Sequence, residues 1–262
     1  MRSSLGRNRL RIVLRQSGPV VTVADVASSL DLPKDKAAQV LARWRAQGWM
    51  KRLRRGVYVS VPLQSVPNDS ALSQPWVLVP VLFDPAYVGG WSAAEHWHLT
   101  EQVFRDTCVF TSRDVRRRRV RVEGTTFILR QTSRLFGLTS IWEGRVKIPI
   151  SDPPRTVIDM ISDPGAGGGM RHVEDCLASY LASADADPTQ LLDYARQASN
   201  GAIFKRLGFL LERSRRATPQ TMAACKAGMT RGNAALDPRL PKERLITRWR
   251  LWVPTSWAGA PR

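Results

Sequence analysis

Cysteine is scarce in this sequence, and apolar runs are short. The three cysteines, Cys108, Cys176 and Cys225, give neither a metal-ligand spacing nor an even disulfide set, which favours a reduced compartment. No apolar run approaches the roughly 20 residues that a membrane span needs. The basic N-terminus lacks the apolar stretch and cleavage site of a signal peptide. We therefore expect a cytoplasmic protein with no membrane partner.

Catalytic signatures are also lacking. The sequence has no Walker A loop, H-E-x-x-H, C-x-x-C or G-x-S-x-G motif. Glu143 and Lys147 have the wrong spacing for a nuclease strand, and His96 and His98 do not face each other on a helix, so packing is favoured over metal binding. The glycine-rich segment 165–169 follows no strand and is expected to be a flexible loop. We predict no catalytic residue, no metal site and no cofactor.

Acidic residues are too few to balance the basic ones. The chain has 40 Lys and Arg against 22 Asp and Glu, a net charge of +18 and a pI near 11.1. Residues 1–62 carry +10 of this charge, 63–160 carry +2, 161–216 are neutral and 217–262 carry +6. Such an excess favours a polyanionic partner, either nucleic acid or an acidic membrane surface. The excess therefore lies at the two ends of the chain, and the middle is nearly neutral.

The N-terminal segment has the pattern of a winged helix-turn-helix. Thr22 is a good N-cap, and Asp25 three residues later completes a capping-box arrangement. Pro33 suits the first position of the next helix, which ends at Gly48. The expected order is a helix at 4–16, a short helix from Thr22, a helix at 33–48, and strands at 50–53 and 56–61. Duplex DNA binding is therefore expected before catalysis.

The second helix of this motif carries candidate DNA-reading side chains on its outward face. Lys34 and Lys36 suit phosphate contacts, Gln39 suits adenine and Arg43 suits guanine in a major groove. For the helix alone, the alternative is an ordinary solvated face, and winged helices also serve as protein-interaction units. The short preceding helix and the basic wing favour DNA.

The wing adds three arginines. Strand alternation predicts Arg52 and Arg54 on one face, with Leu53 and Arg55 on the other. Gly56 lets the tip turn sharply, and arginines at a hairpin tip suit a minor groove or its flanking phosphates. A charged edge strand that blocks aggregation is the alternative.

Beyond the wing, we expect a linker at 63–75 and a mixed α/β domain at 76–262, after a DNA-binding domain at 1–62. The fold class is therefore α+β. The pattern predicts helices at 74–82, 92–98, 154–161, 171–183, 188–199 and 202–214, and strands at 107–111, 117–122, 125–130, 146–150 and 247–253.

Two features of this second part stand out. A second basic cluster consists of Arg113, Arg116, Arg117, Arg118, Arg119 and Arg121. On a strand, half of these arginines would point to each face, so they cannot all line one groove, and one set would contact DNA backbone or an acidic patch on a partner. The alternative is a solvated loop. In the helix beginning at Pro153 and Pro154, Arg155 and Asp159 have the i, i+4 spacing of an ion pair.

Five segments in order resemble the AbiEi antitoxin family. They are Arg55-Gly56-Val57-Tyr58 in the wing, Gly90-Trp91-Ser92-Ala93-Ala94-Glu95-His96-Trp97, Asp152-Pro153-Pro154-Arg155-Thr156-Val157-Ile158-Asp159, Lys205-Arg206-Leu207-Gly208-Phe209-Leu210-Leu211-Glu212, and Leu236-Asp237-Pro238 with Trp249-Arg250-Leu251. The resemblance covers nearly the whole chain. The chain departs from it at Trp97 and His98, where a histidine-glycine-leucine ending is common.

The resemblance implies a type IV antitoxin that represses its own operon by binding promoter inverted repeats in double-stranded DNA. It also implies an AbiEii-like nucleotidyltransferase toxin, counteracted often without a stable complex, and no enzymatic activity. Two alternatives remain open. One is a winged-helix regulator with a ligand- or protein-sensing C-terminal domain, and the other is a DNA-targeted nuclease.

Overall fold

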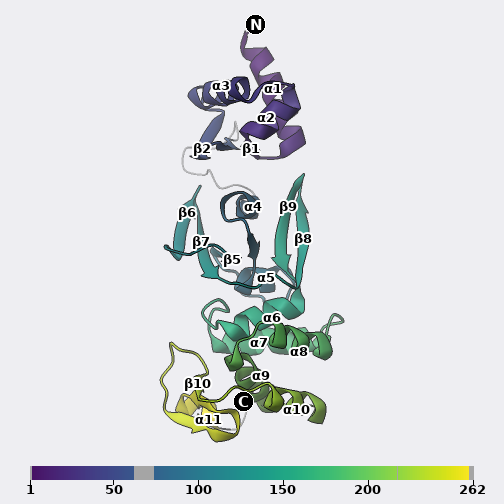
Figure 1. Ribbon diagram of the computed structural model, residues 1–262, viewed down its shortest axis with the longest axis vertical. Helices are drawn as coiled ribbons and strands as arrows, with labels where there is room; N and C mark the ends of the chain where they lie inside the picture. The colour runs from purple at the N-terminus through teal and green to yellow at the C-terminus, as the bar shows by residue number, and fades with distance from the viewer. Residues whose placement is uncertain (1, 62–73, 217, 260–262) are drawn as a thin grey trace. The chain divides into compact units, whose positions relative to one another are not determined.

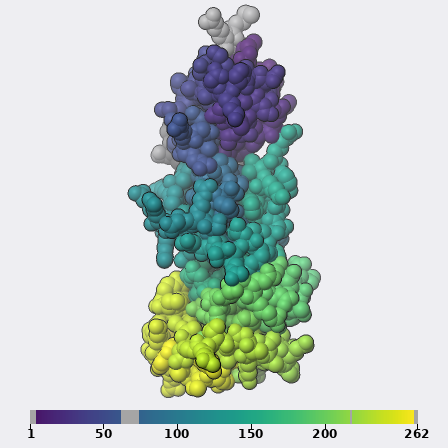
Figure 2. All heavy atoms as spheres, in the orientation of Figure 1, coloured from purple at the N-terminus to yellow at the C-terminus, as the bar shows by residue number. Residues whose placement is uncertain are grey.

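The computed structural model describes residues 2–61, 74–216 and 218–259, and it divides into two compact units (Figures 1 and 2). The first unit comprises residues 1–87, 105–131 and 140–149, and the second comprises 88–104, 132–139 and 150–262. The expected linker at 63–75 lies almost entirely outside the described residues. The architecture is mixed α and β, as expected.

The N-terminal part of the first unit is a winged helix. Its elements are α1 (Arg2–Ser17), β1 (Val20–Thr22), α2 (Val23–Leu30), α3 (Lys34–Ala46), β2 (Met50–Arg54) and β3 (Val57–Ser60). The strands form an antiparallel sheet in the order β1-β3-β2. The helices and the wing agree with the sequence, whereas β1 was not predicted, since three residues are too short to show a period.

Local signals set the bounds of the short helices. The side chain of Thr22 accepts a hydrogen bond from the backbone of Asp25, and the Asp25 carboxylate accepts one from the Thr22 backbone, which confirms the capping box. Gly48, with φ of 74°, follows the end of α3. Pro33 lies at the N-cap of α3, one position before the helical turn that we expected it to begin.

The winged helix has its own core. Val13, Val26, Leu41 and Trp44 are buried from α1, α2 and α3, and Tyr58 of β3 packs against them. Each helix contributes one apolar face, and the basic residues of α3 and those of α1 from Arg7 onward are exposed. This packing fixes which face of α3 is turned to solvent.

The next elements build a six-stranded sheet. They are η1 (Pro75–Leu78), α4 (Val79–Leu82), β4 (Ala86–Val88), α5 (Gly90–His96), β5 (Asp106–Thr111), β6 (Arg119–Val122), β7 (Thr125–Gln131), β8 (Leu138–Glu143) and β9 (Val146–Ser151). The strand order is β6-β7-β5-β4-β9-β8, with β5 parallel to β7 and β6 antiparallel to β7. Glu123 and Gly124 form the hairpin turn between β6 and β7, with φ of 46° and 79°. Strands β4 and β8 were not predicted.

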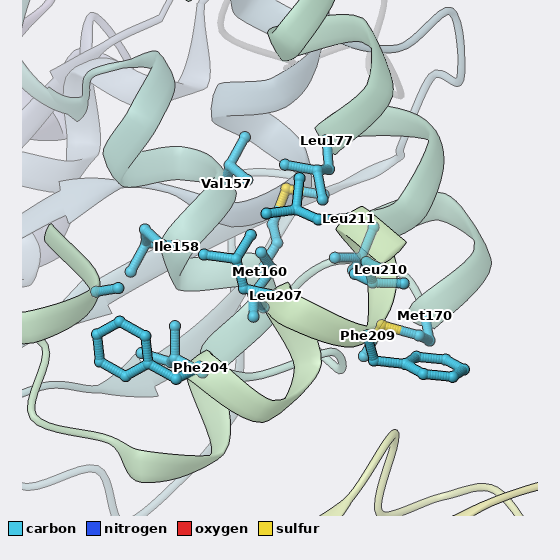
Figure 3. Close-up of a cluster of buried hydrophobic side chains, with 14 of the residues drawn as sticks. Val157, Ile158, Met160, Met170, Leu177, Phe204, Leu207, Phe209, Leu210 and Leu211 are labelled. Carbon is cyan, nitrogen blue, oxygen red and sulfur yellow. The ribbon is translucent and has the colours of Figure 1, made fainter. Parts of the chain in front are cut away.

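Helices dominate the second unit. They are α6 (Pro153–Ser162), α7 (Met170–Ala182), α8 (Pro188–Gln197), α9 (Gly201–Arg213) and α10 (Pro219–Ala227), and α10 was not predicted. Figure 3 shows side chains of α6, α7 and α9 in one cluster, with Leu207 and Met160 among them. Gly208 is required in α9, because a Cβ atom there would lie 2.1 Å from the Trp249 ring. No helix in the described parts of the chain has the length and apolar character to cross a membrane.

Two expectations for the second unit were wrong. The strand expected at 247–253 is a 3₁₀ turn, η2 (Thr247–Trp249), then a left-handed Arg250, then β12 (Leu251–Val253). Every second residue of this segment is nonetheless buried, as in a strand, because Trp249, Leu251 and Val253 are all inaccessible to solvent. Strand β12 lies between β10 (Ala234–Ala235) and β11 (Arg244–Ile246), and α11 (Thr255–Ala258) follows.

The glycine-rich segment 165–169 is a packed turn and not a flexible loop. The backbone N–H groups of Gly167 and Gly169 both donate to Pro164, and Ala166 is buried. Gly169, with φ of 121°, is the N-cap of α7, so a helix does begin directly after the cluster.

Candidate nucleic-acid interface

The outward face of α3 carries the four side chains that the sequence singled out. Lys34, Lys36, Gln39 and Arg43 are all exposed, because Ala37, Leu41 and Trp44 occupy the opposite, buried face (this apolar face is part of the winged-helix core). Within the described part of the chain, none of the four makes an ion pair with a carboxylate. The spacing of Lys36, Gln39 and Arg43 puts these three on one face of α3, whereas Lys34 lies on another side of the first turn.

The α1 residue Arg9 lies beside Arg43 of α3. Arg9 and Arg43 line the same groove, of about 440 Å³, whose other walls include Val40, Trp44 and Gln47. Arg9 is exposed. No local spacing in the sequence points to Arg9, because the position of α1 beside α3 depends on how the two helices pack.

The wing is a tight hairpin whose tip is Arg55 and Gly56, the latter with φ of 78°. The strand register shifts between Arg52 and Arg54, which pair with Tyr58 and Val57 respectively. The regular alternation that we expected for Arg52 and Arg54 is therefore interrupted by a bulge.

The three wing arginines consequently differ in their surroundings. Arg54 donates a hydrogen bond to the backbone oxygen of Val81, so part of its guanidinium is already engaged. Arg52 donates from Nε to the Arg54 backbone oxygen at 3.3 Å. Arg55 is exposed at the turn. The tip residue is thus the wing arginine best placed to contact a partner.

The second basic cluster lies before and along an edge strand of the larger sheet. Strand β6 begins at Arg119, so only Arg119 and Arg121 of the cluster lie in it, and their i, i+2 spacing puts both on one face. The other four arginines lie in the exposed loop before β6, so the solvated-loop alternative holds for them and the division between two strand faces does not apply. Arg119 also forms an exposed ion pair with Asp106 at 2.9 Å.

The wing and the β6–β7 turn contact each other within the first unit. Lys51 of β2 pairs with Glu123 of that turn, Nζ to Oε2, at 3.0 Å. The lysine side chain is 59% exposed, so this pair adds little stability. It does bring the basic wing beside the arginine-bearing strand β6.

Other chemistry-bearing residues lie in the second unit and are engaged in packing. His172 is buried, with Nδ1 2.6 Å from the Gly167 oxygen and Nε2 2.8 Å from the Thr100 hydroxyl. Cys176 lies 3.5 Å from the same Nε2 atom, a pairing that the sequence did not suggest. Burial raises the pKa of the Cys176 thiol to about 12, with a further contribution from Asp175, so the thiol stays protonated and is a poor nucleophile.

The remaining two histidines, His96 and His98, do not point toward a common site. His96 packs edge-on against Trp97, with ring centroids 4.7 Å apart, and burial followed by the neighbouring His98 lowers its pKa. His98 is exposed. Across the residues that the structure describes, no cluster of three or more His, Cys, Asp or Glu side chains could hold a metal ion.

Comparisons with known proteins point to regulators of transcription. Residues 8–61 match the model of a family described as "Transcriptional regulator, AbiEi antitoxin". The matched segment spans α2, α3 and the wing but stops before the other four motifs of the resemblance. None of the curated proteins matches the chain.

The fold as a whole is similar to a solved structure. The crystal structure of the RV2827C protein from Mycobacterium tuberculosis superposes with a TM-score of 0.56 at 15% identity, covering 94% of this chain and 90% of that one. At that identity the likeness concerns the fold alone. The family match confirms the resemblance to the AbiEi antitoxin transcriptional regulators for residues 8–61, which form the winged helix of this chain.

Proposed function

We propose that this protein is a cytoplasmic, non-enzymatic transcriptional repressor and antitoxin that binds inverted repeats in its own promoter. The observation that carries the proposal is the exposure of Lys34, Lys36, Gln39 and Arg43 on α3, within the winged helix that matches the AbiEi regulators. The three cysteines, all free and buried, accord with a reducing compartment.

Each residue of the interface has an assigned role in this proposal. Gln39 and Arg43 enter the major groove and read base edges, while Lys34 and Lys36 contact phosphates. Arg52, Arg54 and Arg55 of the wing contact the neighbouring backbone or minor groove.

The antitoxin half of the proposal concerns an AbiEii-like nucleotidyltransferase toxin, which such antitoxins often counteract without a stable complex. The four AbiEi-like motifs beyond residue 61 support it, because they form the buried framework of the second unit and not a DNA-binding surface. Arg155 and Asp159 of one motif are buried together, and Gly208 of another packs on Trp249. Neutralisation is therefore assigned to the second unit.

A cavity favours one alternative function, a regulator that senses a small molecule. It has a volume of about 930 Å³ at the start of α7, and Arg171, His172, Asp175, Arg239 and Trp257 are among its walls. A change of operator affinity on adding a metabolite would support this alternative. A neighbouring gene for a nucleotidyltransferase would support the antitoxin.

The decisive residue for DNA reading is Arg43. We expect Arg43→Ala to weaken binding to the promoter repeats by about 1–3 kcal/mol while weakening binding to random DNA much less. Fluorescence anisotropy on both duplexes at one salt concentration measures this. Arg196→Ala on α8, another exposed helical arginine, is the control and leaves both affinities unchanged. Equal losses on the two duplexes would contradict base reading by Arg43, and no binding of the wild type to either would contradict the repressor.

Co-expression with the nucleotidyltransferase encoded beside the gene tests the antitoxin half separately. Arg43→Ala should lose repression of a promoter reporter but still rescue growth, since the second unit is unchanged. Failure of the wild-type protein to rescue growth would leave a repressor without antitoxin activity.

A further inference from the structure

A second groove of the winged helix lies on the other side of α1 from Arg9. It has a volume of about 610 Å³, and its apolar floor consists of Leu10, Leu14, Trp49 and Val61. The first three pack against the winged-helix core on one side and remain partly exposed on the other, and Val61 is 37% exposed. The groove is thus apolar surface that the described part of the chain leaves partly open to solvent.

A row of arginines borders this floor. Arg7, Arg11 and Arg15 recur every four residues along α1, line the groove and are all exposed. The guanidinium of Arg7 lies 5.7 Å from the centre of the Trp49 ring, and Arg11 donates a hydrogen bond to Asn8 at 2.8 Å. Among the residues that the structure describes, none of the three pairs with a carboxylate.

The combination of an apolar floor and a basic rim restricts what can occupy the groove. DNA phosphates would satisfy the arginines but leave the floor of Leu10 and Leu14 exposed. A second copy of the same face would bring the two arginine rows together, and like charges repel. An amphipathic segment with an apolar stripe flanked by carboxylates satisfies both parts, as in helix-in-groove recognition.

We propose that this groove binds an acidic amphipathic helix of a partner protein. Leucine-like side chains of that helix cover Leu10, Leu14 and Trp49, and its carboxylates pair with Arg7, Arg11 and Arg15. Arg9 belongs to the separate groove shared with Arg43, so the partner and DNA occupy different sides of α1. The inference does not depend on the proposed repressor function.

The experiment uses the full-length protein and a synthetic amphipathic peptide of roughly 16 residues, above the length at which isolated helices are marginal. Its leucines occupy one face and its glutamates flank them, and a matched peptide has lysines in place of the glutamates. We expect saturable binding of the glutamate peptide by isothermal titration calorimetry, and none of the lysine peptide. The double variant R11E/R15E should weaken binding at least about tenfold, because charge complementarity at the rim becomes repulsion.

The matched control is Arg9→Glu, a charge reversal on the same helix but outside the groove, which leaves peptide affinity within about twofold. Circular dichroism establishes that both variants keep their helices, and Leu14→Ser, which retains the charge, should also weaken binding. Absence of glutamate-peptide binding, or equal losses for Arg9→Glu and R11E/R15E, would overturn the proposal.

Other occupants give distinct results. Loss of promoter binding by R11E/R15E with no change in peptide affinity would assign the arginines to DNA. A dimer in analytical ultracentrifugation that Leu14→Ser dissociates would assign the groove to a second copy. Peptide binding that arises only after residues 62–73 are replaced by glycine and serine would assign the groove to this chain's own linker. Each of these three results overturns the inference of a separate partner.

Discussion

At the scale of single residues, breaking a buried ion pair of the second unit costs more stability than breaking an exposed ion pair does. Arg155 pairs with Asp159 at 2.9 Å, with side-chain exposures of only 3% and 6%. The guanidinium lies 3.8 Å from the centre of the Phe136 ring and donates to the Arg134 backbone oxygen. The sequence predicted this pair from its spacing. Burial, which only the structure shows, makes the pair costly to break, whereas the loss of an exposed i, i+4 pair would cost little.

Removal of one partner tests this difference. Asp159→Ala should lower the free energy of unfolding by about 3–5 kcal/mol, because Arg155 keeps its charge in a buried place. The control is Asp193→Ala, which breaks the exposed pair of Asp193 with Arg196 and should cost about 0–1 kcal/mol. Urea unfolding followed by tryptophan fluorescence measures both, and equal costs would contradict the role of burial.

Asp237 is a second buried carboxylate with a charged partner. Burial acts to raise its pKa, but hydrogen bonds from Arg239 and the charges of Arg239 and Arg206 outweigh burial, so the pKa lies below its ordinary value. The Arg239 bonds measure 2.8 Å and 3.1 Å from its side chain and 2.9 Å from its backbone. The folded protein therefore binds a proton at this site less readily than the unfolded chain does.

The lowered pKa of Asp237 predicts how the free energy of unfolding depends on pH. The contribution of Asp237 is complete above the unfolded-state pKa of about 4 and is lost as pH falls from there through the lower folded-state value. The difference in unfolding free energy between wild type and Asp237→Asn should thus be largest near neutral pH and shrink below about pH 4. Urea unfolding across this range measures the difference, and a difference independent of pH would contradict the lowered pKa.

At the scale of elements, local sequence signals fixed helix ends better than they fixed strands. Thr22 and Asp25 form the capping box of α2 as expected, since all its partners lie within four residues. Strands β4 and β8 escaped prediction, because a three-residue strand shows no period and β8, at the sheet edge, has no clear alternation of burial.

The cap of α2 gives a prediction at this scale. Thr22→Ala should lower the unfolding free energy by about 1 kcal/mol, because the first-turn N–H group of Asp25 loses its acceptor. Ser28→Ala, at an exposed position of α2, is the matched control and should have an effect within about 0.5 kcal/mol. Thermal unfolding by circular dichroism compares the two, and an equal effect would mean that the cap does not stabilise α2.

At the scale of the whole molecule, the net charge of +18 makes association with DNA strongly dependent on salt. In the proposed complex with DNA, Arg55 at the exposed tip of the wing neutralises a phosphate. We expect Arg55→Ala to weaken binding to the promoter and to random DNA alike, and to reduce the slope of log K against log salt by about one. Anisotropy titrations at several salt concentrations measure this.

The control is Arg145→Ala, an exposed arginine in the turn between β8 and β9. It removes the same charge from the molecule but leaves the wing unchanged, so its slope should equal that of the wild type. A reduced slope for both variants would assign the effect to net charge and contradict a wing contact.

Sequence patterns were sufficient to predict the winged helix, the exposed side chains of α3 and the pairing of Arg155 with Asp159 in α6, because each depends on spacing and capping within a few residues. Only the tertiary structure decided that Arg9 joins Arg43, that Arg54 is held by Val81, and that Leu10 and Trp49 form a groove rimmed by arginines. These contacts join residues that are far apart in the chain. The packing of helices and strands against one another determines them, and no local sequence pattern predicts that packing.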